Sequence, residues 1–478
     1  MIPWLVTPVI LPAATAAVML LVARGNLVVQ RVLSLASAAG LLGLALSLAT
    51  RALPRAEALG NWPAPFGIVL VADGLTALML ALVAVLAAVV LLHVLANGVD
   101  RLGASFHPLF QFQLMGLNGA FLTGDAFTLF VFFEVLLIAS YGLVVHGGGA
   151  ERLSAGLRYV VTNLVGSTLF LIGLGVVYAT TGTLNMADLA VKVAALPAGD
   201  FALIRVAAVM LLMVFAVKAA LVPLHVWLPG TYAAAPATVA ALFAVMTKVG
   251  AYAALRFGTL IFPPGTAATD TLYADLLLPA GLVTLAVGSI GMLGARGLNG
   301  VAAHAAITST GTLFVALSAF TPEATAAGLY YLVHSTLAVA ALFLLADIVS
   351  HRGGRSGPVA VLFFAVAIGV AGLPPLSGFL GKLLILQARW QDAALVWPVV
   401  LVTSLVAMVG LSRLGSDLFW KGANPDPAPR ATLTAPAVVL AVLLGLTVCA
   451  GPVLDGMTAV AGALHNPAAY LATVEALQ

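Results

Sequence analysis

Apolar runs of about 20 residues follow one another along almost the whole chain, separated by short polar or Gly- and Pro-rich breaks. A helix of about 20 apolar residues crosses a hydrocarbon core of roughly 30 Å, and it satisfies its own backbone hydrogen bonds there. The pattern therefore predicts an all-α polytopic membrane protein. About fourteen transmembrane helices are expected, near residues 3–23, 31–50, 68–96, 108–123, 126–146, 156–181, 202–228, 236–261, 274–294, 299–320, 325–349, 359–390, 394–420 and 435–455.

Two of these spans contain a similar interruption. The seventh has Pro223 five residues after Lys218, and the twelfth has Pro374 and Pro375 shortly before Lys382. Proline removes a helical hydrogen bond and clashes with the preceding turn, so each span is predicted to break at mid-membrane depth beside a lysine.

The two interrupted spans lie five spans apart, which suggests two equivalent five-helix units. The first would cover residues 105–261 and the second residues 274–422, within one membrane domain flanked by helices in 1–96 and 435–455. An odd number of spans inverts the second unit relative to the first, and inverted repeats with broken helices are typical of transporters. The alternative is that prolines kink two unrelated helices, because proline is common in spanning helices.

Composition agrees with this picture. Hydrophobic residues make up 62% of the chain and charged residues only 8%, against about 25% charged in soluble domains. The one cysteine, Cys449, excludes an internal disulfide, a thiolate metal cluster and a CxxC redox pair. The net charge of +3 comes from scattered residues, which argues against nucleic-acid binding.

The distribution of Lys and Arg predicts the orientation. The loops after odd-numbered spans hold Arg24, Arg31, Arg101, Arg152, Arg158, Arg296, Arg352, Arg355, Arg413, Lys421 and Arg430, whereas the other side holds Arg51, Arg55, Lys192, Arg205, Arg256 and Arg389. Because cytoplasmic loops are enriched in basic residues, the first side is predicted to be cytoplasmic and both termini to lie outside.

Four ionisable residues fall deep inside predicted spans: Glu134, Lys218, Lys248 and Lys382. A charge at a helix centre costs roughly 2.5 to 3.5 kcal/mol on insertion scales, so each requires an explanation. Glu134 has more than a helical turn of apolar residues on either side and cannot reach water. Each lysine has an alternative explanation, since its flexible stem can extend toward the interface.

Glu134 and Lys218 belong to the same unit and could form a buried pair. A carboxylate within about 4–6 Å favours the protonated lysine, and its withdrawal favours proton release, so such a pair can act as a proton switch. A static pair that fixes helix packing is the alternative.

Two histidines extend the series, because His304 and His334 also lie inside apolar spans. Histidine can relay protons near neutral pH, although a buried histidine can also be only hydrogen-bonded. Asp73, Asp125 and Asp347 lie near span ends, where helix capping or interfacial solvation explains them.

Motifs for bound cofactors are missing. The stretch from Ser377 to Lys382 superficially resembles a phosphate-binding loop, but Leu376 and Leu383 occupy positions that need Gly and Ser or Thr. No GxGxxG after a strand and no CxxCH occur. The sequence therefore predicts no cofactor, no metal and no ATP-driven transport within this chain.

Four strings carry a family resemblance: 110–125, 129–141, 218–230 and 372–382. They resemble the proton-translocating antiporter-like subunits shared by respiratory complex I and multi-subunit cation/proton antiporters. Within that family, the chain is most similar to the D-type subunits of the Mrp/Pha antiporters, over nearly its whole length.

The resemblance implies a fourteen-helix fold with two inverted repeats and a proton path along a polar axis at mid-membrane. The positions that match the path residues of the family are Glu134, Lys218, Lys248, His304, His334 and Lys382. The chain departs from the family at Ser335 and Val339, where a second histidine and a lysine are usual. Thr128 and the string 307–311 also differ.

The function implied is a proton-translocating subunit of a Na⁺ or K⁺/H⁺ antiporter, a transporter subunit and not an enzyme. It would work with sister subunits in the bacterial inner membrane, with periplasmic termini. Two alternatives stay open: a proton-pumping subunit of a quinone- or hydrogenase-linked redox complex, and a structural membrane subunit with a vestigial path.

Overall fold

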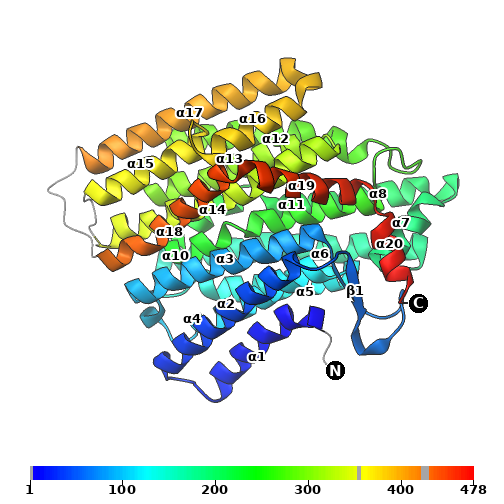
Figure 1. Cartoon of the computed structure of the whole chain (residues 1–478), viewed down its shortest axis with the longest axis horizontal. Coiled ribbons are helices and arrows are strands. Elements are labelled where there is room, and N and C mark those ends of the chain that lie inside the picture. Colours follow the sequence, from blue (N-terminus) through cyan, green and yellow to red (C-terminus); the bar gives the residue numbers. More distant parts are fainter. Residues whose placement is uncertain (1–3, 353–356, 421–429, 478) are drawn as a thin grey trace.

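Long helices run side by side along the length of the molecule in the computed structural model (Figure 1). The structure describes residues 4–352, 357–420 and 430–477, and the side chains of 350–352, 430 and 431 are not described. The predicted basic residues Arg352, Arg355, Lys421 and Arg430 therefore fall outside the described side chains.

Most spans begin and end near the predicted residues. Eleven helical segments in the described part of the chain are long and apolar enough to cross a membrane, or twelve with one bent pair. They include α1 (Thr7–Leu21), α2 (Leu27–Ala49), α3 (Gly74–Asn97), α5 (Ala126–Val144), α6 (Ala150–Thr181), α8 (Phe201–Ala219), α12 (Leu272–Gly294), α13 (Leu298–Leu317), α14 (Pro322–Arg352) and α17 (Ala393–Phe419). The eleventh combines α10 (Ala237–Phe243), α11 (Met246–Arg256) and a π-helical turn, Phe257–Ile261.

The difference from about fourteen arises at three predicted spans. The fourth is α4 (Phe106–Leu122), a 17-residue helix that buries polar Gln111 and Gln113. The twelfth is two short helices, α15 (Gly357–Ala371) and α16 (Ser377–Ala388). The last continues beyond its predicted end as α18 (Arg430–Val448) and α19 (Ala450–His465), which bend by 81°.

Both predicted helix breaks are present. α8 ends at Ala219, the next residue, Ala220, has a left-handed backbone (φ 57°), and the chain passes Pro223 before α9 (Trp227–Ala234) begins. α15 ends before Gly372, whose φ of 79° suits glycine, and α16 starts after Pro374 and Pro375. Proline and left-handed residues therefore interrupt these spans where the sequence indicates.

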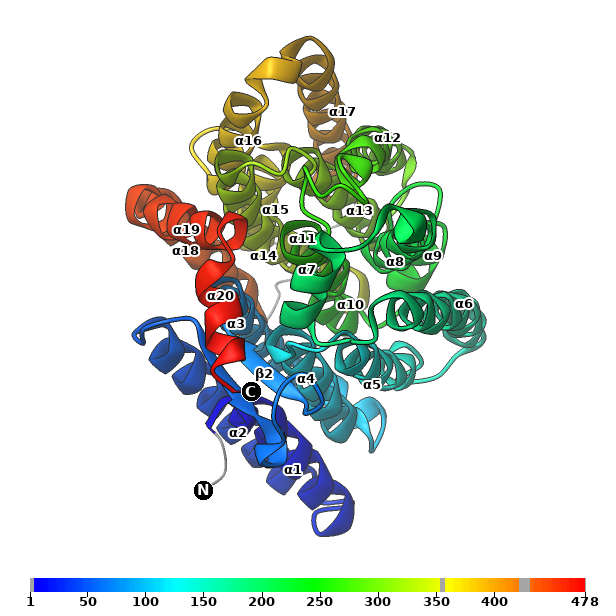
Figure 2. The same ribbon diagram turned by 90° about the vertical axis from the view of Figure 1, so that its right-hand side faces the viewer.

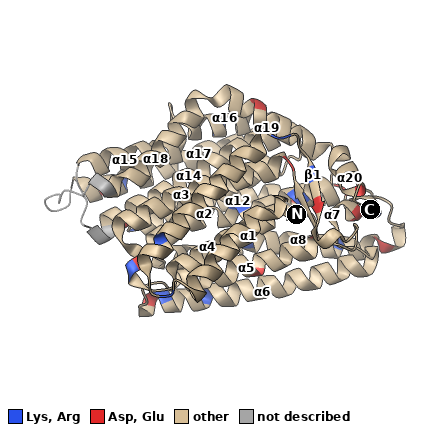
Figure 3. Ribbon diagram, turned by 60° about the horizontal axis from the view of Figure 1, so that its bottom comes forward, with Lys and Arg blue, Asp and Glu red and all other residues tan. Residues whose placement is uncertain are grey.

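The start of α1 and the last helix, α20 (Ala468–Glu475), lie at the same end of the bundle, here called the terminal end (Figures 1 and 2). This end also carries α7 (Met186–Ala194) and the antiparallel strands β1 (Arg55–Ala58) and β2 (Val69–Ala72), in which Arg55 pairs with Ala72. Lys and Arg gather at the opposite end, here called the basic end, whereas acidic residues lie mainly toward the terminal end (Figure 3).

The centre of the bundle is formed by α10, α11 and α14 (Figure 2). The most apolar stretches of 237–261, α13 and α14 are 100%, 89% and 94% buried, against 33% for α2 and α17. The outer helices turn apolar side chains outward, as lipid contact requires. Lys248 therefore lies on the most enclosed segment of the described chain.

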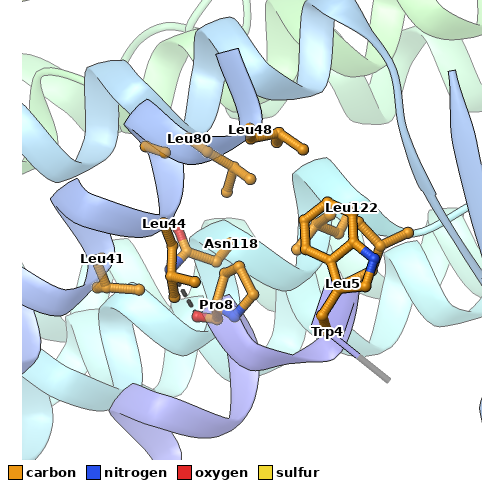
Figure 4. Close-up of a pocket in the computed structure, with 10 residues that line it drawn as sticks. Trp4, Leu5, Pro8, Leu41, Leu44, Leu48, Leu80, Asn118 and Leu122 are labelled. Atoms are coloured by element: carbon orange, nitrogen blue, oxygen red, sulfur yellow. Dashed lines mark hydrogen bonds between the residues drawn. The ribbon is translucent and has the colours of Figure 1, made fainter. Parts of the chain in front are cut away.

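A side-chain hydrogen bond joins the N-terminal helix α1 to α4. The side-chain amide of Asn118 on α4 donates to the carbonyl of Pro8 on α1 over 2.8 Å, beside a small, mainly apolar pocket between α1, α2 and α4 (Figure 4). Since lipid offers no competing hydrogen bonds, this contact helps to fix α1 against α4.

Candidate functional site

Glu134 and Lys218 are connected through the helix that packs between them. The hydroxyl of Ser167 on α6 donates to the carboxylate of Glu134, and the ammonium of Lys218 donates to the side-chain oxygen of Asn163 over 3.1 Å. α6 packs against both α5 and α8. The hydrogen-bonded link between the two charges therefore runs through α6, and Glu134 also interacts electrostatically with Lys218, as the predicted pair requires.

Asn163 and Ser167 are functional candidates that the sequence reasoning missed. They lie four residues apart on the buried face of α6 and follow Tyr159, whose carbonyl accepts from the Asn163 amide over 2.8 Å. The Tyr159 hydroxyl also contacts Ser140 on α5, 2.9 Å away. A polar residue at every fourth position of an apolar span was the signal that could have revealed this face.

Lys218 lies in the last turn of α8, next to the break. The carbonyl end of a helix carries partial negative charge, which favours an ammonium there. Trp227, at the start of α9, donates from its indole to the Val217 carbonyl over 3.0 Å and so satisfies part of the broken helix end. The break therefore creates the polar surroundings of this lysine.

A small cavity of about 10 Å³ lies between Lys218 and the segment that carries Lys248. This is close to the space that one water molecule needs. Lys218 and Asn163 line it together with Phe133, Leu136, Leu137, Tyr159, Trp227, Met246 and Val249.

Lys248 is almost fully buried, with 1% of its surface exposed. Its ammonium donates to the hydroxyl of Ser309 on α13 over 2.7 Å, and that hydroxyl donates to the Ala306 carbonyl over 2.7 Å. A neutral hydroxyl can pair with either protonation state of a lysine, because it both donates and accepts. The site is therefore compatible with a lysine that gains and loses a proton.

A second cavity of about 10 Å³ lies between Ser309 and His334 on α14. It is also lined by Ser335 and Val339, the two positions where the sequence departs from the family pattern. The short side chains of Ser335 and Val339 leave space between Ser309, the partner of Lys248, and His334.

His334 joins α14 to both halves of the second broken span. One ring nitrogen, Nδ1, lies 2.8 Å from the Ser377 hydroxyl at the start of α16, and Nε2 lies 3.2 Å from the Gly369 carbonyl on α15. A Cβ at Gly378 would lie 1.9 Å from the Gly369 oxygen, so only glycine permits this close approach. The break thus positions the imidazole.

Lys382 bridges the same break from the other side. Its ammonium donates to the carbonyl of Ala371, the last residue of α15, and to the Ser404 hydroxyl on α17, both over 2.8 Å. Its side chain is buried, at 6% exposed, so it satisfies the helix end and does not extend to the interface.

His304 is less connected to this group. Its Nδ1 lies 2.9 Å from the Gly300 carbonyl in its own helix, α13, and its ring interacts electrostatically with His225 in the break after α8. The structure therefore arranges five of the six predicted path residues in three polar clusters, with a small cavity between neighbouring clusters. The clusters hold Glu134 with Lys218, Lys248 with Ser309, and His334 with Lys382. His304 lies beside the first break.

The aspartates near span ends have different structural roles. Asp73 and Asp125 cap α3 and α5 by accepting from the Thr76 and Thr128 amides, as predicted. The prediction for Asp347 is wrong, because α14 continues past it and only 5% of its surface is exposed. It is instead bonded to His93 on α3.

Asp73 also pairs with Arg256, which is 4% exposed and donates to both carboxylate oxygens over 2.6 and 2.9 Å. The guanidinium lies over the rings of Tyr252 and Tyr470. This pair ties α11 to α3 and α20 at the terminal end.

We expect Arg256→Met to destabilise the folded protein by about 3–5 kcal/mol, because it leaves a buried carboxylate without its partner. Thermal unfolding of the detergent-solubilised protein would measure this. Asp73→Asn combined with Arg256→Met should recover most of the loss, since the asparagine still caps α3 and no charge is stranded. A single Arg256→Met variant as stable as the natural protein would contradict this account.

Comparisons with known proteins place the chain in a family. Residues 123–408 match the family model described as NADH:quinone oxidoreductase/Mrp antiporter, transmembrane. The chain belongs to this family. It is 38% identical to the probable D-type subunit of a K⁺/H⁺ antiporter from Rhizobium meliloti, over 97% of this chain and 96% of the relative.

A second relative and a solved structure support this family assignment. The D-type subunit of a Na⁺/H⁺ antiporter from Bacillus subtilis is 36% identical over 98% of this chain and 99% of the relative. A chain in the structure of the Mrp complex from Dietzia sp. DQ12-45-1b superposes with a TM-score of 0.89 at 26% identity, covering 99% of this chain and 100% of that chain. The chain is thus a multi-pass membrane protein with the antiporter-like fold.

Proposed function

We propose that this chain is the proton-translocating subunit of a multi-subunit Na⁺ or K⁺/H⁺ antiporter. The observation that carries the proposal is the series of buried and partly buried polar contacts that begins at Glu134 and Lys218 and ends at His334 and Lys382, with Lys248 at its middle. The names of the two relatives favour cation exchange over the redox-linked alternative.

Each group in the series has a chemical role. Glu134 and the three lysines exchange protons, and an approaching carboxylate favours the protonated lysine. The Ser167 hydroxyl can accept and donate, so it can pass a proton, whereas the Asn163 amide orients the Lys218 ammonium. A single water in each cavity would extend the path from Lys218 toward the segment that carries Lys248, and from Ser309 to His334.

The placement of His304 suggests a branch of the path and not a step between Lys248 and His334. It interacts with His225 where α8 breaks, near the first cluster. We therefore assign it to proton exchange around the first break.

The proposal includes a fourteen-span topology with two inverted five-helix repeats, residues 105–261 and 274–422. The eleven long segments reach fourteen when α4, the broken pair α15 and α16, and the bent pair α18 and α19 each count once. An even number agrees with chain ends at the same end of the bundle (Figure 1). Flanking helices lie within 1–96 and 435–455.

We further infer that the basic end faces the cytoplasm and the terminal end the periplasm of a bacterial inner membrane. The concentration of Lys and Arg at the basic end supports this orientation (Figure 3). The partners would be the other subunits of the antiporter complex, protons, and Na⁺ or K⁺.

The test is exchange by the complete complex in inverted membrane vesicles. Adding Na⁺ or K⁺ should dissipate an imposed proton gradient, followed with a pH-sensitive dye, while choline should not. Vesicles with the sister subunits but without this chain are the matched control. Equal dissipation in those control vesicles would reject a transport role for this chain.

A further inference from the structure

Two buried histidine–aspartate pairs lie near the basic end and take no part in the series of contacts between Glu134 and Lys382. In one, Nε2 of His93 on α3 lies 3.0 Å from Asp347 on α14. In the other, Nε2 of His107 on α4 lies 3.0 Å from Asp100, which precedes α4. Both imidazoles are fully buried. The two pairs have the same central distance but different surroundings.

The His107 pair is complete. The second ring nitrogen of His107 lies 2.9 Å from the Ser34 hydroxyl, and Arg31 donates to both Asp100 oxygens over 2.6 and 2.8 Å. Burial alone would raise the pKa of Asp100, but His107 and Arg31 outweigh burial and hold that pKa at about 2. Every polar group of this cluster has a fixed partner, as expected of a contact that joins α2 to α4.

The His93 pair is incomplete. Nδ1 of His93 has no hydrogen-bond partner among the described residues, although the imidazole is fully buried. A buried polar atom without a partner costs about 1–3 kcal/mol, and such atoms in folded proteins usually indicate a bound water or a functional role. Within the described part of the chain, no protein group therefore satisfies this nitrogen, whereas its counterpart in His107 is bonded to Ser34.

The surroundings connect this pair to Lys248. α10 packs against both α3 and α14, and it leads directly into α11. The hydroxyls of Thr238, near the start of α10, and Thr247, beside Lys248, are also buried without partners in the described part of the chain. The ten residues from Thr238 to Lys248 would span about 15 Å as continuous helix, and only Ala244 and Val245 separate α10 from α11. Unpartnered polar atoms thus occur at both ends of this segment.

We propose that His93 and Asp347 form a proton-uptake site that passes protons from the basic end along α10 to Lys248. The inference rests on the proposed function. Asp347, with 8% of its side chain exposed, takes a proton from the basic end and gives it to Nε2 of His93. As Nε2 gains that proton, Nδ1 releases one to water beside α10, so charge and protons balance. Waters bonded to Thr238 and Thr247 carry it to the lysine.

The test substitutes the histidines of the two pairs in the complete antiporter complex. His93→Gln keeps a hydrogen bond to Asp347 but cannot relay a proton, so cation/proton exchange in vesicles should fall at least about tenfold. His107→Gln, the matched control, should keep more than half of the exchange rate. Asp347→Asn should behave like His93→Gln, and Asp347→Glu should restore exchange, which a purely structural role of this pair does not predict.

Every outcome decides the question. Wild-type exchange by an assembled His93→Gln complex, or an equal loss in His107→Gln, overturns the proposal. If the His93→Gln complex does not assemble, exchange by the Asp347→Asn complex tests the proposal in its place. If neither complex assembles, the pair is only structural. Glu134→Gln in the same vesicles separates the two hypotheses. If the Glu134→Gln complex retains exchange, the proposed function is rejected. If Glu134→Gln loses exchange while His93→Gln exchanges normally, only the uptake site is rejected.

Discussion

Replacing Glu134 with glutamine in the intact complex is expected to reduce cation/proton exchange by a factor on the order of 10², the scale typical of removing a positioned acid–base group. Glutamine still accepts from the Ser167 hydroxyl but cannot take up a proton. The rate at which Na⁺ or K⁺ dissipates an imposed proton gradient in vesicles measures the effect.

Helix packing should survive this substitution. An uncharged side chain is less costly than a carboxylate inside a span, so the amount of assembled complex and its thermal stability should not fall. Glu151→Gln, at an exposed position on the first turn of α6, is the matched control and should leave exchange unchanged. An assembled Glu134→Gln complex that exchanges at the natural rate would exclude Glu134 from the path and reject the proposed function, which rests on the series of contacts that begins at Glu134.

Lys248→Met should have an equally large effect, because the neighbouring Met246 and Val249 line one small cavity and Ser309, to which the lysine bonds, lines the other. Methionine fills similar space without a proton to exchange, so exchange should again fall by a factor on the order of 10². Insertion scales assign a lysine at a helix centre about 2.5–3.5 kcal/mol, so thermal stability should stay equal or rise. Activity and stability would then change in opposite directions.

Lys192→Met provides the control for this substitution. Lys192 lies on α7 at the terminal end, where it pairs with Asp188 and 42% of its side chain is exposed. Its loss should leave exchange near the natural rate, since exposed ion pairs contribute little. If Lys248→Met unfolds the complex, or keeps its transport, Lys248 is a packing residue and the central step of the proposed path is wrong.

Several features of the fold could be predicted because they depend on local chemistry. Proline and the residues around it determine where a helix must end, so the breaks near Pro223 and Pro374 followed from the sequence. The break between α10 and α11 has no proline inside it and was not predicted. The bend between α18 and α19 was likewise not predicted, although Gly451 and Pro452 in the first turn of α19 are a local signal for it.

The partners of the buried charges could not be predicted for a different reason. Lys218 and Asn163 are 55 positions apart, Lys248 and Ser309 are 61, and His334 and Ser377 are 43. Apolar residues surround the central helices on every side, so hydrophobic periodicity does not reveal which face meets which neighbour. His93 and Asp347, 254 positions apart, illustrate the same limit.

The sequence by itself therefore determined that the chain spans a membrane, where two spans break, and which charges lie inside them, because insertion costs and proline geometry are local properties. Only the tertiary structure decided that α6 links Glu134 to Lys218, that small cavities separate the polar clusters, and that one of two histidine–aspartate pairs has an open nitrogen. Those features depend on how helices pack against each other, and in an apolar chain that packing is decided by complementary side-chain shapes across distant segments.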